Sequence, residues 1–384
     1  MRVCPGGPVV RCVRVCCGRG RWRVCVPKCV RSTWAYTHLL ARSLCYNTLT
    51  NWDTVNDTLF EPVFWTADRL TRLFGQVFVC LVVVLTSSIV LIAYMVLLPL
   101  VLHTYAPWWI VWHLCYGHWN LLMIAFHYYK ATRTPPGHPP TKKSEVPFVS
   151  FCKKCVTPKP ARTHHCGICN TCILKMDHHC PWLNNCVGHF NHRYFFSFCV
   201  FLTLGCVYCS ISGRNLFIDA YNAIERFKAL EAEPAGVPVK GVGLLIGIVP
   251  PEAVNGQSSF QTPPPTFTLK DKLLNKSIIY MWVLTSTVAV ALGGLTLWHA
   301  MLISRGETSI ERHLNKKERT RLAKRNRVYR NPFHYGCFNN WKLFLGVEKR
   351  SHWITRVLLP SGHAPNGDGF TWDFYPHRKE PLPV

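Results

Sequence analysis

The stretch that decides the fold runs from Cys152 to Cys186 and reads CKKCVTPKPARTHHCGICNTCILKMDHHCPWLNNC. Cysteine and histidine recur in it at the short intervals that metal sites use, including two C-x-x-C pairs. Zinc takes four ligands, and thiolate with imidazole suits it better than any harder cation. Eight such side chains predict two closed tetrahedral sites: Cys152, Cys155, His165, Cys166, Cys169, Cys172, His179 and Cys186. The spacing leaves open how these ligands divide between the two sites.

A second group of polar side chains remains once the zinc ligands are assigned. Asp177, His178 and Cys180 lie almost side by side, with His164 upstream. A purely structural zinc module needs no spare thiol next to a spare imidazole and a carboxylate. A nucleophile, a base and a group that orients the base are the components of a hydrolytic triad. The surplus therefore indicates catalysis.

The residues Asp177-His178-His179-Cys180 spell a DHHC signature, and the flanking pattern resembles the DHHC-type protein S-acyltransferases (palmitoyltransferases). These are membrane enzymes that attach long-chain acyl groups to protein cysteines. Matching elements run from the first apolar span to about Val347. The resemblance implies that Cys180 takes the acyl group from a fatty acyl-CoA such as palmitoyl-CoA and passes it to a cysteine of a client protein. In this scheme His178 accepts the thiol proton and Asp177 orients the imidazole.

The resemblance also implies an interleaved division of the metal ligands between two structural Zn²⁺ ions. One ion would take Cys152, Cys155, His165 and Cys172. The other would take Cys166, Cys169, His179 and Cys186. Each site has three thiolates around a dication, a formal charge of about −1 by ligand counting. The ions are therefore expected to fix the backbone rather than to acidify Cys180.

Apolar runs outside this stretch predict four membrane spans. Residues 73–129 contain no Asp, Glu, Lys or Arg. Because roughly 20 apolar residues cross the hydrocarbon core, this run holds two spans, at about 76–100 and 108–129. Two more follow at about 194–212 and 278–303. The expected fold is an all-α polytopic membrane protein with four transmembrane helices and a cytosolic, zinc-bound, Cys-rich domain between helices 2 and 3.

The domain organisation follows from these spans. Its expected parts are an N-terminal cytosolic arm (1–72, its first ~52 residues disordered), helices 1 and 2 (73–129), the Cys-rich domain (130–193), helix 3 (194–213), a lumenal loop (214–277), helix 4 (278–304) and a cytosolic C-terminal region (305–384). Residues 351–384 are expected to be a tail without a recognisable motif.

The net charge of +25 favours a membrane protein over a nucleic-acid-binding one. Basic residues gather in the N-terminal arm, around the Cys/His block and after the last span, as the positive-inside rule describes. No helix-groove or stacking motif accompanies the charge, so no nucleic-acid partner is expected. Both termini and the reduced thiolates are placed in the cytosol. The sequon at Asn275 then falls on the lumenal side. Resemblance alone suggests a membrane of the endoplasmic reticulum or Golgi.

The position of Cys180, about fourteen residues before the third span, predicts a thiol at the cytosolic interface. An acyl chain could then lie among the spans, and client cysteines would lie in the cytosol close to the membrane. Candidates for the walls of the acyl site are Trp182, Phe195, Phe198 and Gly205. Candidates for binding the CoA phosphates are Lys159, Arg162 and His164. Ordinary helix packing and a solvated cationic face remain open as the alternatives for these two groups.

Two C-terminal motifs also resemble the family. Thr308-Ser309-Ile310-Glu311 resembles its Thr-Thr-x-Glu element, with Ser for the second Thr, and is expected to pack against the Cys/His domain. Asn331-Pro332-Phe333, with Gly336 and Asn340, resembles an aromatic-and-Asn motif that braces the active site. The family's Asp-Pro-Gly tripeptide is absent after the second span, where Pro135-Pro136-Gly137 stands instead.

Two other functions remain open at the level of sequence. A membrane-anchored zinc-binding adaptor without acyltransferase activity would share the zinc ligands, but would have no use for Cys180 beside His178. A metal transporter would need carboxylates inside its spans, and the predicted spans contain none. The acyltransferase is therefore the leading hypothesis.

Overall fold

The computed structural model describes residues 28–46, 52–140, 148–232 and 268–372. The chain divides into two compact units, residues 1–70 and 71–384. The first unit contains α1 (Lys28–Tyr46) and the beginning of α2 (Trp52–Ile92). The prediction of a disordered arm is wrong for α1, which has neither Gly nor Pro to interrupt it. For residues 1–27 the prediction lies outside the described part of the chain.

The first predicted span is one long helical segment with a local irregularity. Helix α2 continues through a short π-helix, η1 (Ala93–Leu97), into α3 (Leu98–Thr104). The π-turn ends two residues before Pro99, which has no backbone N–H to continue the regular ladder. After a turn, α4 begins at Pro107 and ends at Arg133. Proline suits the first position of a helix because the N–H it lacks would be unpaired there.

The remaining predicted spans correspond to α5 (His192–Ser212) and α7 (Leu269–Ser304). Among the described residues, three helices are long and apolar enough to cross a membrane: 59–104, 192–212 and 269–304. Helix α4 has the length but lies outside this set, since its His, Trp and Tyr residues lower its hydropathy. The segment predicted as a loop begins with helix α6 (Arg214–Ala232), which packs on α7.

The Cys-rich segment departs from the all-α prediction, because it contains three antiparallel hairpins. The pairs are β1 (Phe148–Cys152) with β2 (Thr157–Pro160), β3 (His164–Cys166) with β4 (Thr171–Ile173), and β5 (His178–Cys180) with β6 (Asn185–Val187). A 3₁₀ turn, η2 (Pro181–Leu183), joins the last two strands. The chain reverses at Asn184 in the left-handed conformation (φ 48°), which asparagine tolerates better than most residues. The whole protein is therefore mostly helical rather than all-α.

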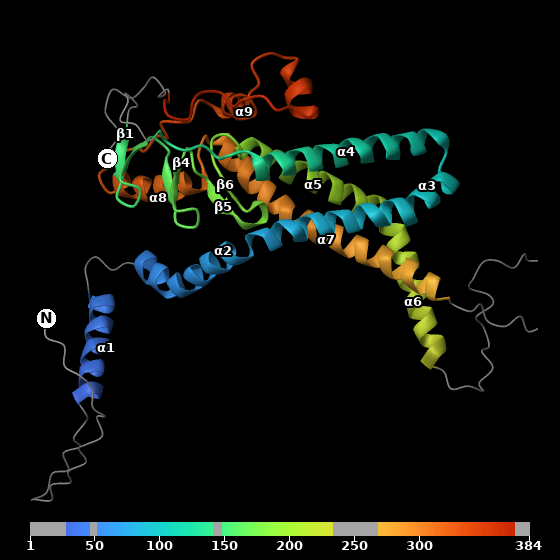
Figure 1. Cartoon of the computed structure of the whole chain (residues 1–384), viewed down its shortest axis with the longest axis horizontal. Coiled ribbons are helices and arrows are strands. Elements are labelled where there is room, and N and C mark those ends of the chain that lie inside the picture. The colour runs from blue at the N-terminus through green and yellow to red at the C-terminus, as the bar shows by residue number, and fades with distance from the viewer. Residues whose placement is uncertain (1–27, 47–51, 141–147, 233–267, 373–384) are drawn as a thin grey trace, which may run out of the picture. The chain divides into compact units, whose positions relative to one another are not determined.

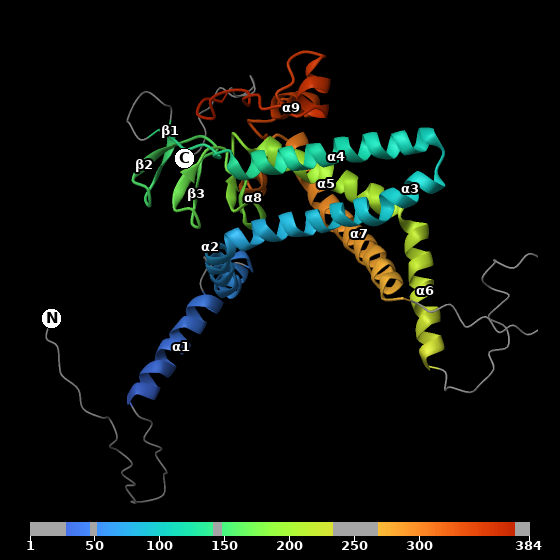
Figure 2. The same cartoon turned by 45° about the vertical axis from the view of Figure 1, so that its right-hand side comes forward.

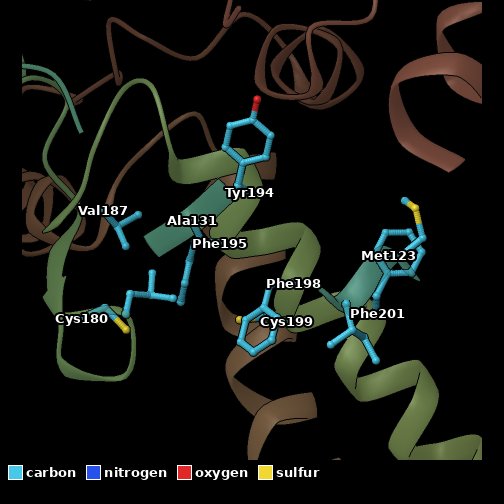
Figure 3. Packing of buried hydrophobic residues seen from close by; sticks show 11 residues of the cluster. Met123, Ala131, Cys180, Val187, Tyr194, Phe195, Phe198, Cys199 and Phe201 are labelled. Atoms are coloured by element: carbon cyan, nitrogen blue, oxygen red, sulfur yellow. The ribbon is translucent and has the colours of Figure 1, made fainter. Parts of the chain in front are cut away.

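The apolar core lies where the third hairpin meets α4 and α5 (Figure 3). Cys180, Leu183 and Val187 from the hairpin are buried together with Phe195 and Phe198 of α5. Helices α4, α5 and α7 lie alongside one another in Figure 1 and Figure 2, and α5 contacts both of its neighbours. This core joins the Cys-rich segment to the ends of the helices.

The C-terminal region contains α8 (Ser309–Ala323), α9 (Cys337–Leu345) and a π-helical turn, η4 (Trp353–Leu358). The tail expected from residue 351 is in fact structured as far as residue 372, the last one described. The Trp119 indole donates to the Leu358 carbonyl (2.8 Å), and His189 lies 3.1 Å from the Gly367 carbonyl. This segment therefore returns to α4 and to the Cys-rich segment, which no sequence motif indicated.

Candidate active site

The first cluster of metal-ligating side chains is formed by the first two hairpins. Cys152 and Cys155 come from the first turn, and His165 is paired with Cys172 across the second hairpin. The His165 Nδ1 lies 3.1 Å from the Cys155 Sγ and 3.7 Å from the Cys152 Sγ. The Cys172 Sγ is 3.6 Å from that of Cys155. All four ligand atoms lie within 4.8 Å of one another.

The second cluster repeats this arrangement one hairpin later. His179 is paired with Cys186 across the third hairpin, and Cys166 and Cys169 flank the turn of the second. The His179 Nδ1 lies 3.3, 3.5 and 3.8 Å from the sulfurs of Cys169, Cys186 and Cys166. The structure thus brings together the same two quartets that the family resemblance implied.

Both quartets have the donors and the spacing that a zinc ion requires. Bond lengths near 2.3 Å to sulfur and 2.0–2.1 Å to nitrogen make the edges of a zinc tetrahedron roughly 3.6–3.8 Å long. The sulfur–nitrogen and sulfur–sulfur separations of 3.1–3.8 Å are close to that range. The cysteines are free thiols rather than disulfides. Three thiolates and one imidazole at each site could therefore hold zinc.

The third hairpin also carries the triad-like residues. The carboxylate of Asp177, 1% exposed, accepts a 2.6 Å hydrogen bond from the His178 Nδ1. The Asp177 backbone N–H donates to the Val187 carbonyl (2.9 Å), which fixes the start of β5. Cys180 is buried at the end of the same strand. The carboxylate therefore comes directly before β5, and the first and last residues of that strand supply the imidazole and the thiol.

The electrostatics of this group favour the charged pair. Burial lowers the pKa of His178, but the hydrogen bond with Asp177 and a contact with Cys180 outweigh it and raise the pKa to about 9. Burial raises the pKa of Asp177, whereas the surrounding imidazoles of His192, His178 and His299 bring it below its ordinary value. An ionised Asp177 beside His178 is the arrangement that stabilises an imidazolium after it accepts a proton.

The Thr-Ser-x-Glu element holds Asp177 from the opposite side. Thr308 caps α8, and the side chains of Thr308 and Glu311 form a reciprocal capping box. At the first position of the helix, Ser309 donates its N–H to the Asp177 Oδ1 (2.8 Å) and its hydroxyl to Oδ2 (3.0 Å). The predicted packing of this motif against the Cys/His domain therefore includes two hydrogen bonds to Asp177 itself.

The four residues predicted to line the acyl site do not all lie together. Phe195 and Phe198 are buried in the cluster that contains Cys180 (Figure 3). Phe195 also meets the His178 ring edge-on, with ring centres 5.0 Å apart. Trp182 is 48% exposed and contacts Phe78 of α2. Gly205 lies elsewhere: a Cβ there would come within 2.5 Å of the Asn120 side chain. This glycine allows α4 and α5 to approach closely.

The three residues predicted to bind phosphate differ in their surroundings. Arg162 is buried in a two-pronged ion pair with Glu311 (2.6 and 2.7 Å) and donates to the Gly306 carbonyl (3.1 Å). Its guanidinium thus contacts the loop and the helix that carry Ser309, and in this position it braces the start of α8. Lys159 lies on β2 and His164 on β3, both half-buried.

The aromatic-and-Asn motif braces the end of α7. Asn340 donates to the Ser304 carbonyl (2.9 Å), and Asn331 donates to the Arg305 carbonyl (2.9 Å). Gly306 takes a positive φ of 65°, and a Cβ there would lie 2.3 Å from the Phe333 carbonyl oxygen. The motif therefore satisfies carbonyls at the helix end and fixes the turn that leads into Thr308 and Ser309.

Breaking the Arg162–Glu311 pair is expected to destabilise the site strongly. Glu311→Gln leaves Arg162 charged and buried, with a side chain only 4% exposed, which costs about 3–5 kcal/mol. We expect a marked fall in the midpoint of thermal unfolding and slower acylation, because α8 would hold Asp177 less firmly. The double variant Arg162→Met/Glu311→Met should recover part of the stability. Equal stability of Glu311→Gln and the unmodified chain would contradict this assignment.

Trp372, outside every sequence motif, is expected to contribute to the same brace. The Arg162 guanidinium carbon lies 4.6 Å from the centre of the Trp372 ring and 4.5 Å from that of Phe333. Such contacts contribute about 0.5–2 kcal/mol each. Trp372→Ala should therefore lower the unfolding midpoint more than Trp353→Ala, which removes a partly exposed ring stacked on Phe338. Thermal unfolding of both variants tests this, and an equal or smaller effect of Trp372→Ala would contradict it.

The sequence of the chain is similar to those of several known proteins. Residues 146–316 match the family model described as DHHC palmitoyltransferase. Palmitoyltransferase ZDHHC16A of Danio rerio is 68% identical over 379 residues, which cover 98% of this chain and 97% of the relative. Palmitoyltransferase ZDHHC16 of Homo sapiens is 55% identical over 369 residues, 96% of this chain and 94% of the relative. A plant relative, probable protein S-acyltransferase 16 of Arabidopsis thaliana, is 28% identical over 225 residues, 58% of this chain and 62% of the relative.

Proposed function

Because the chain belongs to the DHHC palmitoyltransferase family, we propose that Cys180 is the thiol that carries the acyl group in its reaction. The family membership makes the chain a protein-cysteine S-palmitoyltransferase. The observation that supports Cys180 as the carrier is its place on β5, two residues after His178, whose Nδ1 donates to the buried Asp177 carboxylate.

The reaction proceeds in two thioester exchanges. His178 accepts the proton of the Cys180 thiol, and the thiolate attacks the thioester carbon of palmitoyl-CoA. The bond between that carbon and the CoA sulfur breaks, and the CoA thiolate takes the proton from His178. A client thiol then gives its proton to His178 and attacks the acyl-Cys180 carbon, which releases the Cys180 thiolate to recover the proton. Asp177 holds the imidazole in the orientation that both steps need.

The acyl chain lies against the apolar cluster beside Cys180, with Phe195 and Phe198 at its surface and Trp182 at the entrance. Burial of each CH₂ contributes roughly 0.8 kcal/mol, so a sixteen-carbon chain gains a large binding term there. Lys159 and His164 are the candidates for the CoA phosphates. Arg162 acts instead as a positioning residue, since its ion pair with Glu311 fixes the start of α8.

Two zinc ions hold the Cys-rich segment in shape. The first is bound by Cys152, Cys155, His165 and Cys172, and the second by Cys166, Cys169, His179 and Cys186. Three thiolates give each zinc site a formal charge of about −1 by ligand counting, so the ions are assigned a structural role. The zinc sites position the strand that carries Asp177, His178 and Cys180, and the proton chemistry belongs to His178.

The chain crosses the membrane four times, with α4 as the second span, so that both termini and Cys180 face the cytosol. The support is the charge distribution: Lys130 and Arg133 end α4, and Arg305 follows α7. Client cysteines are therefore cytosolic and close to the membrane. The proposed location is the endoplasmic reticulum or Golgi, which microscopy of a tagged full-length chain would test.

A pulse–chase experiment tests Cys180 as the carrier. The full-length chain in lipid nanodiscs is loaded briefly with an alkyne-tagged palmitoyl-CoA, freed of the donor, and mixed with a membrane-anchored peptide that has one cysteine. We expect a hydroxylamine-sensitive label on the tryptic peptide containing Cys180, and its transfer to the cysteine peptide but not to a serine analogue. A label that stays on other cysteines would contradict the proposal. No label on a chain that binds two zinc ions would instead indicate an adaptor.

A further inference from the structure

His299, on α7, is buried beside the reacting residues without an assigned role. Its side chain is 4% exposed, and its Nδ1 lies 3.9 Å from the Asp177 Oδ2. That nitrogen has no hydrogen-bond partner among the described residues. A buried donor or acceptor without a partner is unfavourable, because it has lost its hydrogen bonds to water. The nearest charged oxygen is that of Asp177, roughly 1 Å beyond hydrogen-bond distance.

The ring of His299 packs against other aromatic rings. Phe195 meets it edge-on with ring centres 5.1 Å apart, and His192 does so at 6.0 Å. The His178 ring is 5.7 Å away. His299 therefore lies in a layer of rings behind the pair formed by His178 and Asp177, within reach of the carboxylate.

The carboxylate of Asp177 has room for a further donor. Its Oδ1 accepts one hydrogen bond, from the Ser309 N–H, and its Oδ2 accepts two, from His178 and from the Ser309 hydroxyl. An ionised carboxylate offers about four acceptor positions. A buried carboxylate also needs its neighbours to replace the water that would otherwise stabilise its charge. By this count the remaining position is on Oδ1, so rotation of the two side chains has to bring the His299 Nδ1, which now lies 3.9 Å from Oδ2, to that oxygen.

We propose that His299 is a positioning residue that donates an additional hydrogen bond from its Nδ1–H to Asp177 during acyl transfer. The bond forms when small rotations of the two side chains close the gap between them. It keeps the Asp177 carboxylate in the orientation that holds His178 beside Cys180. His299 thus acts through Asp177, without contact with the substrate. The inference rests on the proposed role of Cys180 and adds a residue from α7 to that site.

The same three side chains, Asp177, His178 and His299, also have a spacing that a metal ion could use. Two observations favour the hydrogen bond. Both Asp177 oxygens already accept hydrogen bonds from Ser309, and the His178 Nδ1 is directed at the carboxylate itself. Zinc counting separates the alternatives, because a third site would give three ions per chain.

The test compares donor-containing and donor-free replacements of His299 in the full-length chain. His299→Phe keeps a ring without a donor, and His299→Asn places an amide N–H near the position of Nδ1. The measurements are the single-turnover rate of acyl-Cys180 formation, the KM for palmitoyl-CoA and the zinc content. His127→Phe is the matched control, since His127 is a buried histidine on α4 that stacks on Phe201 and has no hydrogen-bond partner in the described part of the chain.

We expect His299→Phe to slow acyl-Cys180 formation about 10- to 100-fold, the range typical for second-layer partners, with KM and two zinc ions per chain unchanged. His299→Asn should restore most of the rate, and His127→Phe should not lower it. In a chain that already carries Asp177→Asn, His299→Phe should have little further effect, because both changes remove the same interaction.

Several results would overturn the inference. One is an unchanged rate of acyl-Cys180 formation in His299→Phe, and another is a loss of rate that His299→Asn does not restore. A third is an equally large loss of rate when His299→Phe is added to Asp177→Asn. The last is a fall in zinc content from three ions per chain to two. If His299→Phe does not fold, His299→Leu, which matches the shape of Asn without its donor, replaces it. Absence of acyl-Cys180 in the unmodified chain would contradict the proposed function instead, so the two failures are distinguishable.

Discussion

Cys180→Ser is expected to abolish acyl transfer. Loss of the nucleophile in a triad lowers turnover by about 10³- to 10⁶-fold. Serine keeps the shape of the side chain, but its hydroxyl is a far weaker acid than a thiol. His178 therefore deprotonates it much less readily, and little of the attacking anion forms. The measurement is in-gel detection of alkyne-palmitate on wild-type and Cys180→Ser chains, each with and without hydroxylamine. The wild-type label should be sensitive to hydroxylamine and absent from the variant.

The matched control for this experiment is Cys337→Ser. Cys337 is an exposed thiol on α9, outside the triad and the two Cys/His clusters, so it could accept an acyl group passively. Its replacement should leave the label unchanged. A wild-type level of thioester label on Cys180→Ser would show that other cysteines accept the acyl group. Any ester formed slowly on the hydroxyl that replaces the thiol would resist neutral hydroxylamine, which distinguishes it from a thioester.

The apolar helices and the residues of the two Cys/His clusters could be predicted from the sequence because each depends on local composition. A run of charge-free residues is sufficient to place α5 and the apolar part of α7, and the spacing of cysteine and histidine is sufficient to identify the eight side chains that the structure brings together in two clusters. The boundaries were less predictable. Helix α7 begins at Leu269, before its apolar part, because Thr268 and Asp271 form a capping box in polar surroundings. Helix α6 has no long apolar run from which it could be predicted.

The support for the active site was the part that sequence could not supply. Ser309 follows Asp177 by 132 positions, and only the fold brings its N–H to the carboxylate. Trp372 and His299 belong to no motif considered in the sequence, and their contacts depend on how the C-terminal segment and α7 pack. The charge of Arg162 predicts a phosphate-binding residue, whereas its buried ion pair with Glu311 indicates a structural role. Charge indicates what a side chain can bind, whereas packing determines what it does bind.

Loss of one zinc ligand is expected to unfold the Cys-rich segment and abolish activity without touching the triad. This segment consists of three two-stranded hairpins of three to five residues per strand, and isolated hairpins of this kind are marginally stable in water. Binding of structural zinc supplies about 10–16 kcal/mol in small zinc modules, which here becomes folding free energy. Cys169→Ser should therefore bind fewer than two zinc ions, become sensitive to protease within residues 148–187, and lose the acyl label.

The contrast between Cys169→Ser and Cys180→Ser separates the structural from the catalytic thiols. Cys180→Ser should keep two zinc ions and its resistance to protease while it loses the label. Cys169→Ser should lose all three properties, since β5 can present Cys180 to His178 and to the apolar cluster only while the metal sites hold the hairpins in register. Treatment of the wild-type chain with a strong zinc chelator should reproduce the effects of Cys169→Ser. Full labelling of a chain that has lost its zinc would mean that the apolar contacts of β5 and η2 with α4 and α5 are enough to position the nucleophile.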